Sequence, residues 1–267
     1  MTDLKTLMNM TGRRALITGA AGGLGRAMAD SLAELGADLV LVDLPGADTP
    51  AFARQIEQKH GTAVVVKECD LEQAAQRTAL AKQVLTGEGH LDVLVNNAAF
   101  VGSSNLSGWA EAFEDQTIDT WRRALEVNLT AAFHLCQLFA PALRNSRGGS
   151  IINTTSIYGQ WGPDWALYEG TGMSNPAAYG ASKGGLVQLT RWLSTTLAPE
   201  IRVNAISPGG VARNQPEAFV SRHEARTPLG RMAREDDFRG AIAYLASDLS
   251  AYVTGQVLAV DGGWGVW

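Results

Sequence analysis

The stretch Ala15-Leu-Ile-Thr18-Gly19-Ala-Ala-Gly22-Gly23-Leu24-Gly25-Arg26-Ala27 decides the fold, because an apolar run passes through a glycine-rich turn into an amphipathic sequence. The apolar run predicts a buried strand, and the sequence after the turn predicts a helix. In such a unit Gly19 allows the tight turn, Gly23 lets the backbone approach a pyrophosphate, and Gly25 permits close helix packing. The helix start adds free N–H groups and a positive dipole end. We therefore predict a dinucleotide-binding loop formed by Gly19, Gly23, Leu24 and Gly25.

The next apolar run ends in an acid, Asp43. A carboxylate about 20 residues beyond such glycines binds both hydroxyls of the adenosine ribose and repels the 2′-phosphate of NADP. No Arg or Lys stands in the loop before Gly25 or directly after Asp43 to reverse that preference. The sequence therefore predicts NAD as the cofactor.

The rest of the chain alternates short apolar runs with longer amphipathic ones, as in a parallel sheet covered by helices on both faces. We expect seven strands, at Ala15–Thr18, Leu39–Val42, Ala63–Lys67, Val93–Asn96, Ser150–Thr154, Arg202–Ile206 and Val257–Val260. This predicts an α/β fold of the doubly wound (Rossmann) type with a seven-stranded parallel sheet. No repeat or linker interrupts the alternation, so we expect one domain over residues 1–267.

Two expected helices, Thr120–Leu143 and Tyr179–Leu197, are longer and more apolar than a surface helix requires. Helices that are apolar on several faces are often buried against a partner subunit. Trp264 and Trp267 lie close to the chain end and need burial to be ordered, so we expect them at a subunit boundary. These features favour a homo-oligomer.

Composition excludes several classes of function. The chain has 22 Lys and Arg against 27 Asp and Glu, a net charge of −5, and no basic run that could follow a nucleic acid. It shows neither a signal-peptide pattern nor an apolar run of about 18 residues, so we expect a cytoplasmic protein without a membrane span. Cys69 and Cys136 form no Cys-x-x-Cys and are expected in the core. The four histidines lack ligand spacing, so no metal is expected.

The pair Tyr179 and Lys183 carries the chemistry. On a helix this spacing places the phenol and the ammonium on one face. A free tyrosine has a pKa of about 10, and a neighbouring cation favours the phenolate. Together they can move a proton to or from a hydroxyl or carbonyl oxygen.

These segments together resemble the short-chain dehydrogenase/reductase family, in its branch of single-domain proteins of about this length. The resemblance extends from Gly12 to Gly263. It is carried by Thr18-Gly19-x-x-x-Gly23-x-Gly25, Asp70-Leu71, Asn96-Asn97-Ala98-Ala99, Asn128, Ser156, Tyr179-x-x-x-Lys183 and Ser207-Pro208-Gly209-Gly210-Val211.

The resemblance implies a role for each matched residue. Asp70 and Leu71 would contact the adenine, Asn97 and Ala98 would line the cofactor pocket, and Pro208, Gly209 and Val211 would lie near the nicotinamide. The catalytic set would be Asn128, Ser156, Tyr179 and Lys183, acting on a secondary alcohol or a ketone. Ser156 would hold the substrate oxygen, Lys183 the nicotinamide ribose, and Asn128 a water that joins Lys183 to solvent. The family also implies a homotetramer.

Two positions depart from the family pattern. Many relatives have Gly where this chain has Ala99, which should only tighten the pocket wall. Arg213 stands where relatives often carry a Thr that binds the nicotinamide carboxamide, which puts that contact in doubt. Arg213 faces either the cofactor, an anionic substrate or solvent, and its bidentate fork would suit a carboxylate or phosphate.

The segment 157–178, between Ser156 and Tyr179, is longer than in most relatives and should stand beside the reacting carbon. It forms either a substrate wall or an ordinary lid or subunit contact. A second segment, at about 209–230, is expected on the same side. The segment 157–178 and the stretch from Ser207 to Pro216 resemble oxidoreductases found with bacterial surface-sugar and sialic-acid-like sugar pathways. The expected substrate residues are Trp161, Trp165, Tyr168, Glu169 and Arg213, which offer aromatic faces and polar groups for a polyhydroxylated ligand.

Three functions remain open from the sequence. The first is an NAD-dependent dehydrogenase of a sugar, sugar derivative or polyol. The second is a 3-oxoacyl thioester reductase, against which Asp43 and the acidic total argue, because such enzymes prefer NADP and need a basic entrance for a carrier protein. The third is a catalytically silent NAD-binding regulator, which the intact catalytic set disfavours.

Overall fold

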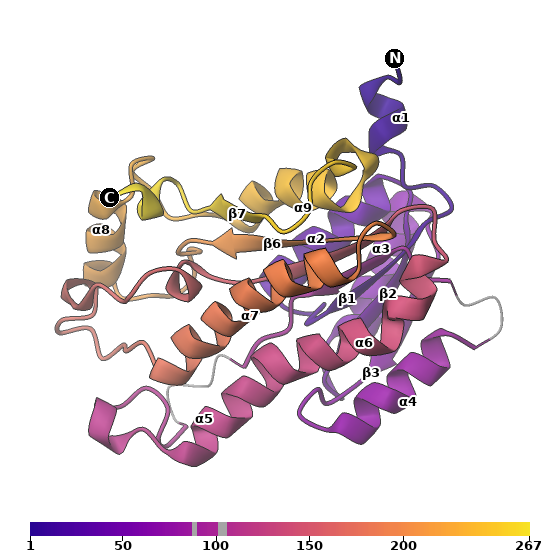
Figure 1. The fold of residues 1–267 in the computed structure, drawn as a ribbon. Helices are drawn as coiled ribbons and strands as arrows, with labels where there is room; N and C mark the ends of the chain where they lie inside the picture. The colour runs from indigo at the N-terminus through magenta and orange to yellow at the C-terminus, as the bar shows by residue number, and fades with distance from the viewer. Residues whose placement is uncertain (87–89, 101–105) are drawn as a thin grey trace.

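The computed structural model describes residues 1–86, 90–100 and 106–267, and its centre is a seven-stranded parallel sheet (Figure 1). The strands lie in the spatial order β3-β2-β1-β4-β5-β6-β7. They are β1 (Arg14–Thr18), β2 (Asp38–Asp43), β3 (Val64–Glu68), β4 (Val93–Asn96), β5 (Gly149–Thr154), β6 (Ile201–Pro208) and β7 (Val257–Val260). Each expected strand is present, with its ends displaced by two residues at most, and the doubly wound fold is confirmed.

Helices cover both faces of the sheet (Figure 1). One face carries α2 (Gly23–Glu34), α3 (Thr49–His60) and α9 (Arg239–Ala246). The other carries α4 (Ala74–Val84), α6 (Ala131–Arg144) and α7 (Ala177–Thr196), and α5 (Ile118–Leu125) packs on α7. The helix α8 (Glu217–Arg226) lies beyond the sheet near the C-terminus, and α1 (Leu4–Met8) projects from the opposite end. None of the helices in the described ranges is long and apolar enough to span a membrane.

Short helical turns connect these elements. The 3-10 turns are η1 (Phe113–Asp115), η3 (Ile157–Gly159), η4 (Trp165–Leu167), η5 (Glu235–Phe238), η6 (Asp248–Ser250) and η7 (Trp264–Val266). The long helix expected at Thr120–Leu143 is present as α5 and α6, joined by a π-helical turn, η2 (Glu126–Thr130). Such π turns inside α-helices are often found at functional sites. The second long helix starts two residues earlier than expected, at Ala177.

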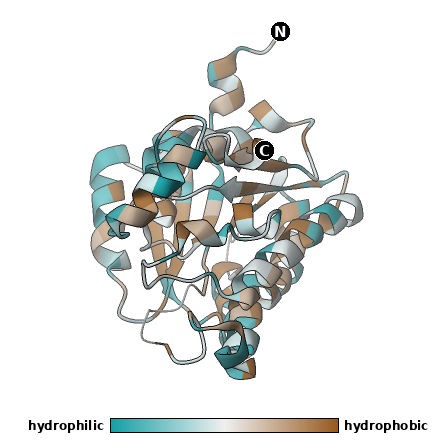
Figure 2. Ribbon diagram, turned by 90° about the vertical axis from the view of Figure 1, so that its left-hand side faces the viewer, coloured by the Kyte–Doolittle hydropathy of each residue, from teal (hydrophilic) through white to brown (hydrophobic). Residues whose placement is uncertain are grey.

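The core consists of two apolar layers, one on each face of the sheet. The middle strands are buried along almost their whole length, so buried and exposed positions do not alternate along them, and in β5 the polar Ser150, Asn153 and Thr154 are buried too. The helices combine hydrophobic and hydrophilic residues, as Figure 2 shows. Cys69 and Cys136 are core residues, and burial raises the pKa of their thiols to about 11 and about 12.

The two C-terminal tryptophans differ in burial within the single chain. Trp264 is only 2% exposed, because it stacks on His223 at 4.5 Å and lies under Arg226 within its own chain. It therefore needs no partner subunit for burial. Trp267 is 72% exposed, and its indole N–H donates to the carbonyl of Arg226.

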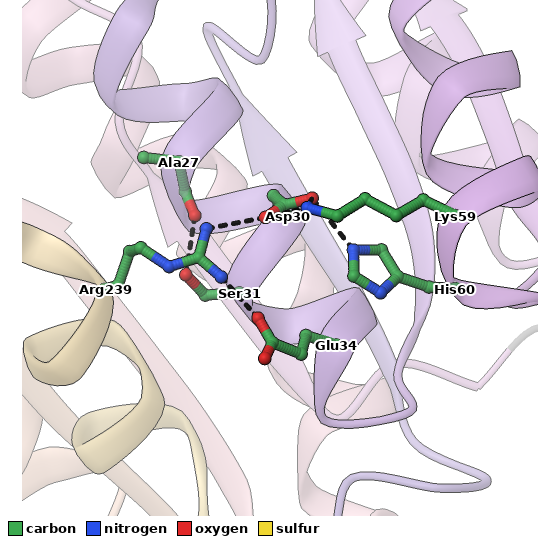
Figure 3. A network of polar contacts seen from close by, with 7 residues as sticks. All are labelled: Ala27, Asp30, Ser31, Glu34, Lys59, His60 and Arg239. Carbon is green, nitrogen blue, oxygen red and sulfur yellow. Dashed lines mark hydrogen bonds and ion pairs between the residues drawn. The ribbon is translucent and has the colours of Figure 1, made fainter. Parts of the chain in front are cut away.

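A polar network ties α2 to α3 and α9 (Figure 3). Asp30 accepts hydrogen bonds from Lys59 at 2.8 Å, from His60 at 2.8 Å and from Arg239 at 2.6 Å, and Arg239 also pairs with Glu34. Burial alone would raise the pKa of Asp30, but the hydrogen bonds from Lys59, Arg239 and His60 outweigh it and lower that pKa well below its usual range. The start of α9 is thereby fixed against the middle of α2.

The variant Asp30→Asn should lower the free energy of unfolding by roughly 1–2 kcal/mol at pH 7, because Arg239 and Lys59 lose a partly buried anion. Since the pKa of Asp30 is lower in the folded than in the unfolded chain, its contribution is complete about one pH unit above the unfolded value of about 3.9 and is lost progressively as the pH falls toward the folded value. Denaturant unfolding from pH 7 to pH 3 should therefore show the difference shrinking below about pH 5. Asp115→Asn, at an exposed carboxylate, is the control. A difference that stays constant down to pH 3 would contradict this account.

Candidate active site

A groove of about 460 Å³ follows the carboxyl ends of the central strands, where parallel α/β sheets bind ligands. We call it the central groove. Its lining residues come from the glycine loop, the ends of β2, β4, β5 and β6, and the start of α7: Gly19, Gly22, Gly23, Leu24, Gly25, Asp43, Asn97, Ala98, Ala99, Thr154, Thr155, Ser156, Tyr179, Lys183, Pro208, Gly209, Val211 and Arg213.

Two further hollows share residues with the central groove. The edge pocket, of about 250 Å³, shares Asp43 with it and contains Asp70 and Leu71. The aromatic pocket, of about 440 Å³, shares Ser156, Tyr179 and Gly209. Every residue expected to bind the cofactor lines the central groove or the edge pocket. The sequence pattern therefore selects residues that the fold brings together along one continuous surface.

The first turn of α2 points its backbone into the central groove. Gly22 is the N-cap, and no side chain caps the helix, so its first N–H groups are available to an anion. A Cβ on Gly19 would lie 2.8 Å from the Cα of Ala98, which keeps this position free of a side chain. Asn97 closes the floor of the groove by donating to the carbonyls of Thr18 and Gly19 at 3.0 and 3.1 Å.

Asp43 lies where the central groove meets the edge pocket. One of its carboxylate oxygens accepts the N–H of Ala21 at 2.7 Å, and the other accepts the N–H of Leu44 at 2.8 Å. A cation also approaches this corner, because Arg26 donates to the carbonyl of Ala21 at 2.9 Å and to Asp48 at 3.3 Å. The sequence argument missed Arg26, which follows the last glycine and reaches back one helical turn.

Tyr179 lines both the central groove and the aromatic pocket, and Lys183 lines the central groove. Lys183 is 2% exposed, donates to the carbonyl of Thr154 at 2.7 Å, and lies 5.8 Å from the centre of the Tyr179 ring. Burial lowers the pKa of Lys183 to about 8. Burial also raises the pKa of Tyr179, and a hydrogen bond with Ser156 partly offsets that rise. The hydrogen bond with Ser156 therefore favours the phenolate of Tyr179.

Asn128 acts from behind these residues, in the π turn η2. Its side-chain oxygen accepts the N–H of Phe100 at 2.6 Å, and its amide donates to Ser182 at 2.9 Å. Ser182 in turn donates to the carbonyl of Tyr179 at 2.8 Å. Asn128 thus fixes the first turn of α7, and its side chain makes no direct contact with Lys183 among the hydrogen bonds of the described residues.

The aromatic pocket combines rings with hydrogen-bonding groups. Tyr158 and Tyr168 share a hydrogen bond of 2.6 Å between their hydroxyls, and the amide of Asn175 donates to Tyr168 at 3.3 Å. Phe219 and His223, four residues apart on α8, complete the far side. Both 157–178 and 209–230 therefore contribute lining residues. No Asp, Glu, Lys or Arg occurs among the described residues that line this pocket.

Of the five residues expected to contact a substrate, the structure places only Tyr168 in the aromatic pocket. Trp161 and Trp165 are 52% and 56% exposed and line a neighbouring hollow with Phe113. Glu169 is exposed, and its carbonyl accepts a hydrogen bond from Arg222. Residue spacing alone missed Tyr158, Asn175, Phe219 and His223. The aromatic i, i+4 pair Phe219 and His223 was the one signal available in the sequence.

Arg213 lines the central groove and not the aromatic pocket. It pairs with Glu235 at 3.1 Å beside the glycine loop. The sequence left open whether Arg213 faces the cofactor, a substrate or solvent. In the structure it lies in the groove that is expected to hold the cofactor.

The residues present fit a nicotinamide dinucleotide. The uncapped helix start suits a pyrophosphate, Asp43 suits ribose hydroxyls, and the buried cation Lys183 lies at the opposite end of the groove. Among the described residues there is no group of three or more His, Cys, Asp or Glu that could hold a metal ion.

Comparison with known proteins agrees with this geometry. A family model described as enoyl-(acyl carrier protein) reductase matches residues 19–265. The chain is 32% identical over 263 residues to the 3-oxoacyl-[acyl-carrier-protein] reductase FabG of Thermotoga maritima, covering 96% of this chain and 99% of that protein. It is 36% identical over 255 residues to a trans-4-hydroxycyclohexanecarboxylate dehydrogenase of Sinomonas cyclohexanicum, covering 93% and 91%.

Solved structures give the same result. A gluconate 5-dehydrogenase from Burkholderia cenocepacia J2315, in complex with NADP and tartrate, superposes with a TM-score of 0.87 at 29% identity, covering 99% of this chain and 100% of that one. A short-chain type dehydrogenase/reductase from Mycobacterium marinum superposes with a TM-score of 0.86 at 30% identity, covering 99% of both chains. The chain belongs to the short-chain dehydrogenase/reductase family of oxidoreductases.

Proposed function

We propose that this protein is an NAD(H)-dependent oxidoreductase that interconverts a secondary alcohol and a ketone on a sugar, sugar derivative or polyol. The observation that carries the proposal is the shared wall of two hollows: Ser156 and Tyr179 line both the central groove and the aromatic pocket. A substrate oxygen held by these hydroxyls would lie where a cofactor in the groove meets a ligand in the pocket.

In this reaction Tyr179 takes the proton from the substrate hydroxyl, or returns it to the carbonyl oxygen in the reverse direction. A bound nicotinamide supplies the hydride acceptor or donor. Ser156 donates a hydrogen bond to the substrate oxygen and stabilises its developing charge. Lys183 binds ribose hydroxyls of the cofactor, and Asn128 holds the start of α7 so that Tyr179 keeps its position.

The preference for NAD rests on Asp43, whose carboxylate lies at the ribose end of the groove. Two considerations oppose this preference. The gluconate 5-dehydrogenase relative carries NADP. In addition, Arg26 lies close to Asp43, because Arg26 donates to the carbonyl of Ala21, whose N–H Asp43 accepts. Asp43 holds the backbone of the loop itself through Ala21, so a 2′-phosphate would have to approach this carboxylate closely. That repulsion favours NAD.

The substrate class follows from the aromatic pocket. Its hydroxyl and amide groups can exchange hydrogen bonds with several substrate hydroxyls, while the rings pack on the carbon chain. The gluconate dehydrogenase relative supports a sugar-like substrate, and the proposed link to surface-sugar metabolism rests on the segment 157–178. A 3-oxoacyl thioester is the second candidate, because FabG is a relative of matching length.

We further propose one catalytic domain over residues 1–267, a substrate wall formed by 157–178 and about 209–230, a cytoplasmic location and a homotetramer. Exposed large apolar residues support the assembly, because a partner subunit could bury them. Trp121 on α5, Phe133 on α6 and Trp192 on α7 are 36%, 42% and 55% exposed.

Tyr179→Phe should lower kcat by roughly 10²–10⁴-fold while NADH still binds, because the variant lacks the hydroxyl that transfers the proton but keeps the glycine loop. The measurement is nicotinamide absorbance with sugars, sugar phosphates, nucleotide sugars, polyols and acyl thioesters. Tyr252→Phe, at a fully exposed tyrosine, is the control. Turnover within a few fold of wild type would remove Tyr179 from its role, and turnover of acyl thioesters alone would select the second candidate.

Lys183→Met should abolish turnover without lowering the free energy of unfolding at pH 7, because burial makes the charged amine unfavourable in the folded chain. With its pKa lowered to about 8, Lys183 binds fewer protons folded than unfolded between about pH 8 and pH 10.4. Wild-type stability relative to the variant should therefore rise over that window in denaturant titrations. Lys82→Met, at an exposed lysine on α4, should show no such change.

Asp43→Ala should reduce the ratio of kcat/KM for NAD to that for NADP by roughly tenfold or more, since a charged hydrogen-bonding group is removed. In the Asp43→Ala background, the further change Arg26→Gln should lower kcat/KM for NADP again, because the 2′-phosphate would lose its attraction to the Arg26 guanidinium beside Ala21. Equal wild-type kinetics with both cofactors would refute the preference for NAD.

A further inference from the structure

Arg213 and Glu235 form an ion pair directly over the glycine loop. A Cβ placed on Gly23 would lie 2.6 Å from the Oε1 of Glu235 and 2.7 and 2.8 Å from the two terminal nitrogens of Arg213. The guanidinium and the carboxylate are 3.1 Å apart. Both charged groups therefore cover the first residue of α2.

The backbone brings these two residues together by register. Val211 and Ala233 form a parallel bridge, with hydrogen bonds of 2.8 Å from Ala233 to Gly210 and from Ala212 to Ala233. Arg213 and Glu235 each stand two residues beyond the bridge, on the same side. The position of Glu235 is fixed further by η5 and α9, which Arg239 anchors to α2 (Figure 3).

The charges at this place are arranged for an anion. The start of α2 has no side-chain cap and presents the positive end of the helix dipole. Arg213 lines the same groove as Gly22, Gly23 and Leu24, so a diphosphate on the loop would lie between the backbone N–H groups and the guanidinium. The planar fork of Arg suits two phosphate oxygens. The carboxylate of Glu235 lies beside the start of α2 and pairs with Arg213.

We propose that Arg213 is a diphosphate-binding residue of this chain, and that the cofactor diphosphate replaces the carboxylate of Glu235 as its partner. The side chains are 50% and 35% exposed, and ion pairs this accessible to water are weak and readily exchanged. Glu235 thus weakens binding of a diphosphate by holding the guanidinium and by repelling the incoming charge. The inference rests on the proposed dinucleotide binding and adds to it a residue pair that sets affinity.

Calorimetric titration of the full chain with ADP and with adenosine tests the proposal, because only ADP carries the diphosphate. Arg213→Gln should weaken ADP binding roughly tenfold and leave adenosine binding unchanged. Glu235→Gln should tighten ADP binding by about threefold. Arg54→Gln, at an exposed arginine on α3, removes one positive charge as Arg213→Gln does, and it should leave the affinities for ADP and adenosine unchanged.

The double variant Arg213→Gln with Glu235→Gln isolates the exchange of partners. If Glu235 acts by holding Arg213, the gain from Glu235→Gln should largely disappear once Arg213 is gone. An equal gain in both backgrounds would overturn the exchange, and unchanged ADP affinity in Arg213→Gln would overturn the diphosphate contact. A wild-type chain that binds neither ADP nor NADH would instead refute the proposed function itself.

Discussion

The contact between the carboxyl ends of β1 and β4 is the constraint on which the rest of the site depends. Thr18 donates to the carbonyl of Val95 at 3.3 Å and accepts the N–H groups of Asn97 and Ala98, each at 3.1 Å. Here the strand order reverses, which opens the crevice that ligands use. A Cβ on Gly25 would collide with the carbonyl of Gly19, so α2 can start directly behind β1 only because that side chain is absent. The groove is thus a consequence of two close backbone approaches.

Buried polar contacts add direction to the apolar packing that positions Tyr179 and Lys183 on α7. Asn153 on β5 accepts from Asn96 and donates to Thr190 on α7, both at 2.9 Å, and Lys183 donates to β5 at the carbonyl of Thr154. These bonds have direction, so they fix the rotation of α7 as well as its distance from the sheet. The π turn adds Asn128 on the other side of the same helix. The helix that carries Tyr179 is therefore fixed on its sheet side through Thr190 and Lys183, and on its other side through Ser182.

The sequence predicted the elements built from local information. Continuous apolar runs predicted the buried strands, and the glycine spacing predicted the loop, because each follows from backbone geometry within a few residues. The π turn at Asn128 was not predicted, because the sequence from Glu126 to Thr130 contains no Gly or Pro that would mark an irregular turn. The lining of the aromatic pocket was missed for another reason. Phe219 meets Tyr168 at 5.4 Å although the two residues are 51 positions apart in the sequence, and only the path of two long segments brings them together.

Long charged side chains hold those two segments in place. Arg222 donates to the carbonyls of Ala166, Leu167 and Glu169, and Arg226 pairs with Asp164. The wall at 157–178 is therefore attached to α8, and the same stretch of chain carries Arg213 to the glycine loop. Because one connected region touches both hollows, a change at the substrate wall can alter the position of Arg213. The ends of the central strands position Ser156 and the glycine loop, whereas these arginines, on a helix with little apolar burial, hold the lining of the aromatic pocket together.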